Sequence, residues 1–134
     1  MERRRLIHVI ATARDGTLSA LDAARRLGAE QDANLVLLVP HIVPFVPTNG
    51  AIEDTAALTE MYRTLASQAG VDVTVRVCLC RRPEDVCSSL LVEPTTIVVG
   101  GRRRRWWPTP AERLARRLSR THQVIFADVA EACS

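Results

Sequence analysis

The 134 residues suffice for one domain with its own hydrophobic core and leave little room for a second. Hydrophobic residues make up 47% and charged residues 25%, which excludes a disordered chain, and the apolar runs are too short to cross a bilayer. The net charge is only +3, and the 18 basic residues are all arginines gathered in local runs. We therefore expect a single domain over residues 1–134, located in the cytoplasm and without a membrane segment.

The first half of the chain alternates continuous apolar runs with an amphipathic segment. Leu6–Ala13 has the apolar, β-branched character of a buried strand, and the turn signal Asp15-Gly16 follows it. From Leu18 onward the apolar residues recur at helical spacing, which predicts the first helix. The apolar run Leu35–Val39, which can extend to Ile42, is typical of a parallel strand covered on both faces.

The middle of the chain contains an irregular connection and a second helix. Three prolines within residues 40–50 exclude a helix there. An apolar stripe from about Ile52 to Ala69 predicts a long helix that ends at Gly70. Val71–Cys80 alternates apolar and polar residues, which indicates a strand near a sheet edge, and a short helix is predicted from Pro83 to about Val92.

The last third of the chain combines a strand, a basic loop and a sharply defined helix start. Thr96–Val99 predicts a fourth strand that ends at two glycines. Thr109-Pro110-Ala111-Glu112 has the spacing of a capping box and predicts a helix from Pro110 to Arg120, with a fifth strand over Val124–Val129. This regular alternation predicts an α/β fold with a parallel sheet and helices on both faces.

Residues suited to ligand binding follow three of the predicted strands. Ligands in such folds bind beyond the carboxyl ends of the strands, so we expect these residues to converge. Backbone N–H groups at the last helix start and the arginines after the glycines suit an anion such as phosphate, although both features also occur as ordinary structural elements. The candidate ligand-binding residues are Asp15, Gly16, Pro40, Gly100, Gly101, Arg102, Arg103 and Thr109.

The cysteines and histidines do not form a recognisable catalytic or metal-binding pattern. Cys78, Cys80, Cys87 and Cys133 are interpreted as small hydrophobic residues rather than as a disulfide framework or metal ligands. The three histidines are scattered along the chain. We therefore assign no catalytic and no metal-ligating residue.

Several segments, in their order and spacing, resemble the universal stress protein family over nearly the full length of the chain. They are HVIATARDGT, ANLVLLVPHIV, SQAGVDVTVRVCLCRRPEDVCSSL, and above all TTIVVGG with PAERLARRLSRTHQVIFADV. The resemblance implies a five-stranded parallel sheet in the order 3-2-1-4-5, an adenine-nucleotide alpha-hydrolase-like fold. It also implies a homodimer joined along the last strand, with Val124, Phe126 and Val129 at the interface, and ATP or another adenine nucleotide as the ligand.

Members of this family that bind ATP have the pattern Gly-x2-Gly after the fourth strand and Gly-Ser/Thr at the following helix start. By resemblance, Asp15 and Pro40 would face adenine and ribose, and Gly100 would hold the first glycine position. The second glycine position falls on Arg103 and the closing pair on Pro108-Thr109. Because arginine and proline cannot bring backbone N–H groups to phosphates as glycine does, we do not expect ATP in the family's usual manner.

We interpret the chain as a non-catalytic regulatory or binding module, dimeric, with a phosphate-bearing small ligand at Gly100–Arg105. The alternative is a weak nucleotide-binding or nucleotide-hydrolysing protein, for which Asp15 and Glu112 would be the acids. Nucleic-acid binding through the arginine face of the last helix is not favoured, because no known nucleic-acid-binding motif is present. Trp106 and Trp107 could stack on a base, cover the pocket or pack against the fold or a partner, and packing is favoured.

Overall fold

A computed structural model of the chain describes residues 5–43, 49–83, 85, 95–103 and 106–129. Its helices and strands are β1 (Leu6–Ile10), α1 (Arg14–Gln31), β2 (Asn34–Ile42), α2 (Asn49–Gln68), β3 (Thr74–Cys80), β4 (Thr96–Gly101), α4 (Pro110–Leu118) and β5 (Gln123–Asp128). The short helix predicted from Pro83 to about Val92 lies almost wholly outside the described residues, as do Cys87 and Cys133.

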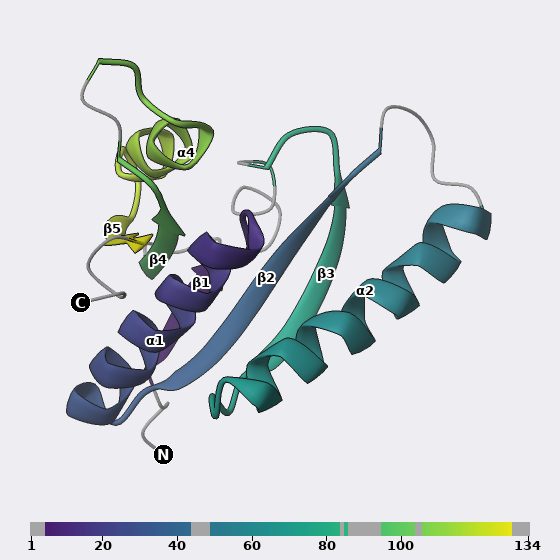
Figure 1. The fold of residues 1–134 in the computed structure, drawn as a ribbon, viewed down its shortest axis with the longest axis horizontal. Helices are drawn as coiled ribbons and strands as arrows, with labels where there is room; N and C mark the ends of the chain where they lie inside the picture. Colours follow the sequence, from purple (N-terminus) through teal and green to yellow (C-terminus); the bar gives the residue numbers. More distant parts are fainter. Residues whose placement is uncertain (1–4, 44–48, 84, 86–94, 104–105, 130–134) are drawn as a thin grey trace.

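The strands form one five-stranded sheet in the order β3-β2-β1-β4-β5, and every pair is parallel (Figure 1). This confirms the fold predicted from the alternation of elements and from the family resemblance. The three inner strands β1, β2 and β4 are the continuous apolar runs, because both of their faces are covered. The alternating strand β3 lies at one edge of the sheet, as its pattern predicts.

The two faces of the sheet carry different helices. Figure 1 shows α1 running alongside β1 and α2 alongside β3, and both helices pack against the strand residues that share a face with Val9 and Leu37. Helix α4 packs on the opposite face, where Ile10 and Leu38 point. Right-handed crossovers produce this arrangement when the chain winds outward in both directions from β1. Within the described residues, no helix is both long and apolar enough to cross a membrane.

Most predicted boundaries are wrong by a few residues; β1, for example, ends at Ile10 and not at Ala13, and β3 begins at Thr74 and not at Val71. Helix α1 begins at Arg14 rather than at Leu18, so Asp15 lies in the first helical turn and not in a loop. The Thr17 hydroxyl stabilises this early start, because it accepts from the N–H of Thr12 at 2.9 Å and donates to the carbonyl of Ala13 at 3.0 Å. Helix α2 begins at Asn49 instead of Ile52, and β5 ends at Asp128, which leaves Val129 beyond the strand.

Candidate functional site

A cavity of about 430 Å³ lies at the carboxyl ends of β1, β2 and β4, between the first turns of α1 and α4. Of the predicted site residues, those that line it are Asp15, Gly16, Pro40, Gly101, Arg102 and Thr109. Gly100 and Arg103 are not part of its lining. The sequence reasoning missed most of the wall, which is largely apolar and is formed by Ala11, Thr12, Ala13, Ile42, Pro83, Pro110, Ala111, Leu114 and Val129.

Gly100 has a structural role beneath the cavity. It is buried against the first turn of α1, where a Cβ atom would collide with the backbone carbonyl of Gly16. The Thr12 hydroxyl donates to the Gly100 carbonyl at 2.7 Å and strengthens the same contact. The two glycines therefore let helix α1 approach β4 closely, and this approach places Asp15 at the cavity.

Asp15 and Arg102 meet at the opening of the cavity, as their positions after β1 and β4 predict. An Arg102 Nη2 atom lies 3.5 Å from Asp15 Oδ2, and the two side chains are 70% and 62% exposed. A solvent-exposed ion pair of this kind contributes at most about 1 kcal/mol to stability. The ion pair can therefore break, and each charged group can bind a ligand instead, with little loss of stability.

The first turn of α4 is capped by its own side chains. The predicted capping box is present, with Glu112 N–H donating to the Thr109 hydroxyl at 3.2 Å and Thr109 N–H donating to Glu112 Oε1 at 3.2 Å. Pro110 has no N–H, and Arg113 N–H donates to the Thr109 carbonyl, so Ala111 supplies the one remaining N–H of this turn. With the Glu112 carboxylate also present, this helix end is a poorer anion site than the sequence indicates.

Arg103 and the two tryptophans contribute no surface to the cavity. The Arg103 guanidinium carbon lies 5.0 Å from the centre of the Phe126 ring, a cation–π contact beside β5. Trp106 and Trp107 are 81% and 78% exposed. Neither tryptophan lines the cavity. Most of each indole is uncovered in the single chain, and packing against a partner chain stays a prediction.

The described cysteines are free thiols on β3. Cys78 and Cys80 are half-buried and pack against the core on the α4 side of the sheet. Burial raises the pKa of the Cys78 thiol, which keeps it protonated and weakly nucleophilic. Within the described residues, no three His, Cys, Asp or Glu side chains are grouped as metal ligands would be.

This sheet order, with a cavity at the carboxyl ends of the strands, is that of a doubly wound α/β fold, whose ligands bind at this edge of the sheet. Within that class the chain has the fold of the universal stress proteins. A universal stress protein in complex with cAMP is 17% identical, with a TM-score of 0.61 over 96% of this chain and 99% of that one.

Two further structures extend the comparison. A universal stress protein family member from Arabidopsis thaliana with AMP bound is 15% identical, with a TM-score of 0.56 over 95% of this chain and 94% of that one. The universal stress protein from Archaeoglobus fulgidus in complex with dAMP is 10% identical, with a TM-score of 0.54 over 94% of this chain and 98% of that one. No protein-family model matches the sequence, and no curated protein is significantly similar to it.

Proposed function

We propose that the chain is a non-catalytic regulatory module of the universal stress protein type, which acts in the cytoplasm as a homodimer and binds an adenine nucleoside monophosphate. The observation that carries the proposal is the cavity of about 430 Å³ at the strand ends. Its volume falls within the range of about 300–1,000 Å³ that small-molecule sites occupy. The ligands of the three similar structures, cAMP, AMP and dAMP, all combine adenine with a single phosphate.

Different residues of the cavity lining suit the purine, the ribose and the phosphate of such a ligand. Pro40, Ile42 and Leu114 belong to the apolar wall and suit the faces of a purine ring. The Asp15 carboxylate can accept hydrogen bonds from ribose hydroxyls, and the Arg102 guanidinium can pair with the phosphate. The phosphate would replace Asp15 as the partner of Arg102.

The capped start of α4 favours a monophosphate over ATP. A triphosphate needs several N–H donors along its length, and the first turn of α4 offers only that of Ala111. The Glu112 carboxylate repels additional negative charge at the same place. The second and third phosphates of ATP therefore add little binding free energy in this site.

The described lining of the cavity has too few acidic side chains for nucleotide hydrolysis, so we expect it to bind a nucleotide without hydrolysing it. Asp15 is the one carboxylate among the described residues that line the cavity. Phosphoryl transfer requires groups that hold a metal ion and groups that orient the attacking water. The nucleotide-hydrolysing alternative predicts phosphate release that Asp15→Ala abolishes, and we expect no release above background from the wild type.

Calorimetric titration with adenosine, AMP and ATP tests the proposal. We expect AMP to bind about tenfold more tightly than adenosine, through Arg102, and ATP to bind no more tightly than AMP. Arg102→Gln should reduce AMP affinity to that of adenosine. Arg116→Gln, an exposed arginine on α4 outside the cavity lining, is the matched control and should leave affinity unchanged. Absence of binding by all three ligands, or a clear preference for ATP, would contradict the proposal.

A further inference from the structure

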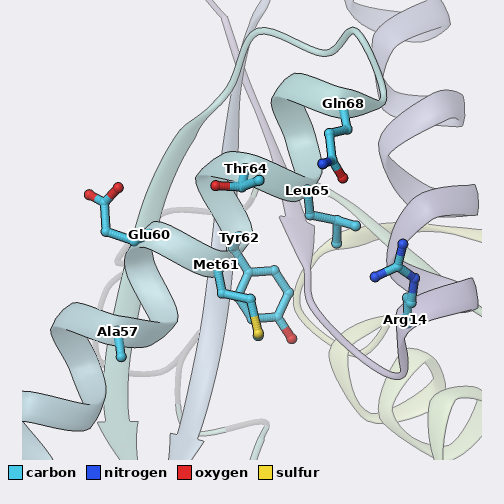
Figure 2. Close-up of a pocket in the computed structure, with 8 residues that line it drawn as sticks. All are labelled: Arg14, Ala57, Glu60, Met61, Tyr62, Thr64, Leu65 and Gln68. Atoms are coloured by element: carbon cyan, nitrogen blue, oxygen red, sulfur yellow. The ribbon is translucent and has the colours of Figure 1, made fainter.

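A second and larger cavity lies on the other side of the first turn of α1. It measures about 580 Å³ and is formed between the start of α1 and the middle of α2 (Figure 2). Arg14 lines it from α1, and the residues that line it from α2 are Ala57, Glu60, Met61, Tyr62, Thr64, Leu65 and Gln68. Its position is separate from the nucleotide cavity, which Ala13 and Asp15 line on either side of Arg14.

The floor of this cavity is apolar and preformed. The Tyr62 ring packs against the core between the sheet and helices α1 and α2, and Leu65 is buried beside it. Met61 is 53% exposed, although its side chain is apolar. A flexible thioether at the edge of a rigid apolar surface can adapt to the shape of a ligand and gains burial when one binds.

The α1 end of the cavity is positively charged. Arg14 is the first residue of α1, where the helix dipole disfavours a cation, and it has no ion pair among the described residues. Glu60, the one acid in the lining, pairs with Arg63 at 2.9 Å, and in Figure 2 its carboxylate points away from Arg14. Asp15, the acid in the same first turn, pairs with Arg102 at the other cavity, so an anion next to Arg14 would meet a guanidinium that has no ion pair among the described residues.

Neutral hydrogen-bond donors accompany the arginine. Figure 2 shows the Tyr62 hydroxyl on the side of α2 that faces α1, and the Gln68 amide near the Arg14 end. Burial raises the pKa of the Tyr62 phenol, so the hydroxyl stays protonated and can donate. A guanidinium, a hydroxyl and an amide together match the oxygens of a carboxylate.

We propose that this cavity is a binding site for an amphipathic carboxylate, a small molecule with one carboxylate group and a short hydrocarbon or aromatic body. The carboxylate pairs with Arg14, and the apolar body lies along Met61, Tyr62 and Leu65. A small molecule suits the site better than a protein segment, because the apolar floor is concave and has one cationic end. The proposal does not depend on nucleotide binding at the other cavity.

Octanoate tests the proposal, with octylammonium as a probe of equal length and opposite charge. The protein is labelled with 13C at the methionine methyl groups, and the Met61 signal is identified by its loss in Met61→Leu. We expect octanoate to shift the Met61 signal in a saturable way and octylammonium to bind about tenfold more weakly. AMP should not displace octanoate.

Variants of Arg14 test whether the cavity binds the carboxylate group or only the apolar body of a ligand. Arg14→Gln should weaken octanoate binding about tenfold while raising the melting temperature of the free protein, because it removes a cation from the start of α1. Arg116→Gln is the control and should leave octanoate binding unchanged. Equal binding of the two probes, unchanged octanoate affinity in Arg14→Gln, or no shift of the Met61 signal would each overturn the proposal. Equal binding would instead indicate a surface for a protein partner.

Discussion

Gly16 and Gly100 bring the backbones of helix α1 and strand β4 into direct contact. A Cβ atom on Gly100 would meet the backbone of Gly16 and lie 3.0 Å from the amide nitrogen of Ala20. Neither neighbour can rotate away as a flexible side chain could. The contact therefore determines how close Asp15 lies to the cavity, and it explains a glycine that resemblance alone would assign to phosphate binding.

We expect Gly100→Ala to lower the free energy of unfolding by about 3 kcal/mol, because the added methyl group forces backbone apart in a packed region. Gly70→Ala is the matched control. Gly70 has open space around it, but its φ of 72° is unfavourable for alanine, so we expect a loss of only about 1 kcal/mol. Urea denaturation of both variants measures the difference. Equal losses would show that β4 and α1 can separate at little cost.

His8 connects stability to pH. It is buried on β1, its Nδ1 lies 3.2 Å from the Thr95 hydroxyl, and the Thr95 N–H donates to Nδ1 of His122 at 3.2 Å. Burial, and then the charges of Arg76 and His122, lower the pKa of His8 below its ordinary value of 6.5. The folded protein therefore resists protonation of His8 more strongly than the unfolded chain does.

The free energy of unfolding should fall as the pH is lowered through 6.5, because the unfolded chain binds the proton first. Above that pH both states are neutral at His8, and the stability is fully retained. In His8→Gln the slope of stability against pH between about 7.5 and 5.5 should be smaller than in the wild type. Urea denaturation at several pH values gives these slopes. The same slope in His8→Gln and in the wild type would contradict the assignment.

Among the elements, the two helices next to the cavity at the strand ends begin in different ways. Helix α4 has a complete capping box from Thr109 and Glu112. Helix α1 follows Ala13, which makes no side-chain hydrogen bond to the helix, and it is held instead by the Thr17 hydroxyl and by contact with β4. One helix start is therefore determined locally, and the other depends on the sheet.

Removing the cap of α4 should destabilise the protein measurably. The Thr109 hydroxyl accepts from Glu112 N–H and also donates to the Arg102 carbonyl at 2.8 Å, so it joins the helix to the loop after β4. We expect Thr109→Ala to lower the free energy of unfolding by about 1 kcal/mol. Thr109→Ser should keep most of the stability that the alanine variant loses. Chemical denaturation distinguishes the two variants. A serine variant as unstable as the alanine variant would mean that the methyl group, not the hydroxyl, stabilises this site.

At the scale of the whole molecule, strand β5 leaves one edge of the sheet without a neighbouring strand among the described residues. An unpaired parallel edge is a natural place for two copies to join. Val129 lies beyond β5, is buried and lines the cavity at the strand ends, so a contact along this strand would depend on Val124 and Phe126. The homodimer remains a prediction.

We expect the wild type to have the mass of a dimer in light scattering after gel filtration. Val124→Lys should convert it to a monomer, because a charge on the edge opposes pairing with a second copy. Thr74→Lys, on the opposite edge strand β3, should leave the dimer intact. Circular dichroism shows whether both variants fold. A monomeric wild type, or a folded Val124→Lys variant that still dimerises, would contradict the β5 interface.

Periodicity and side-chain spacing predict the succession of the described strands and helices and the capping box of α4, because these features depend on residues only a few positions apart. The sequence also indicated that residues following β1, β2 and β4 would converge, because parallel strands end at one edge of the sheet. The predicted start of α1 was wrong at Arg14, where the helix start depends on contact with β4 as well as on the Thr17 hydroxyl.

Which side chains enclose each cavity depends on how the elements pack against one another. Ile42 lies on β2, Leu114 on α4 and Val129 just beyond β5, and none of them carries a local signal of a shared site. Arg14 and Met61 are likewise far apart in the chain and meet only because α1 and α2 lie on the same face of the sheet. Cavities form between elements, and the distances between elements depend on packing that no short stretch of sequence encodes.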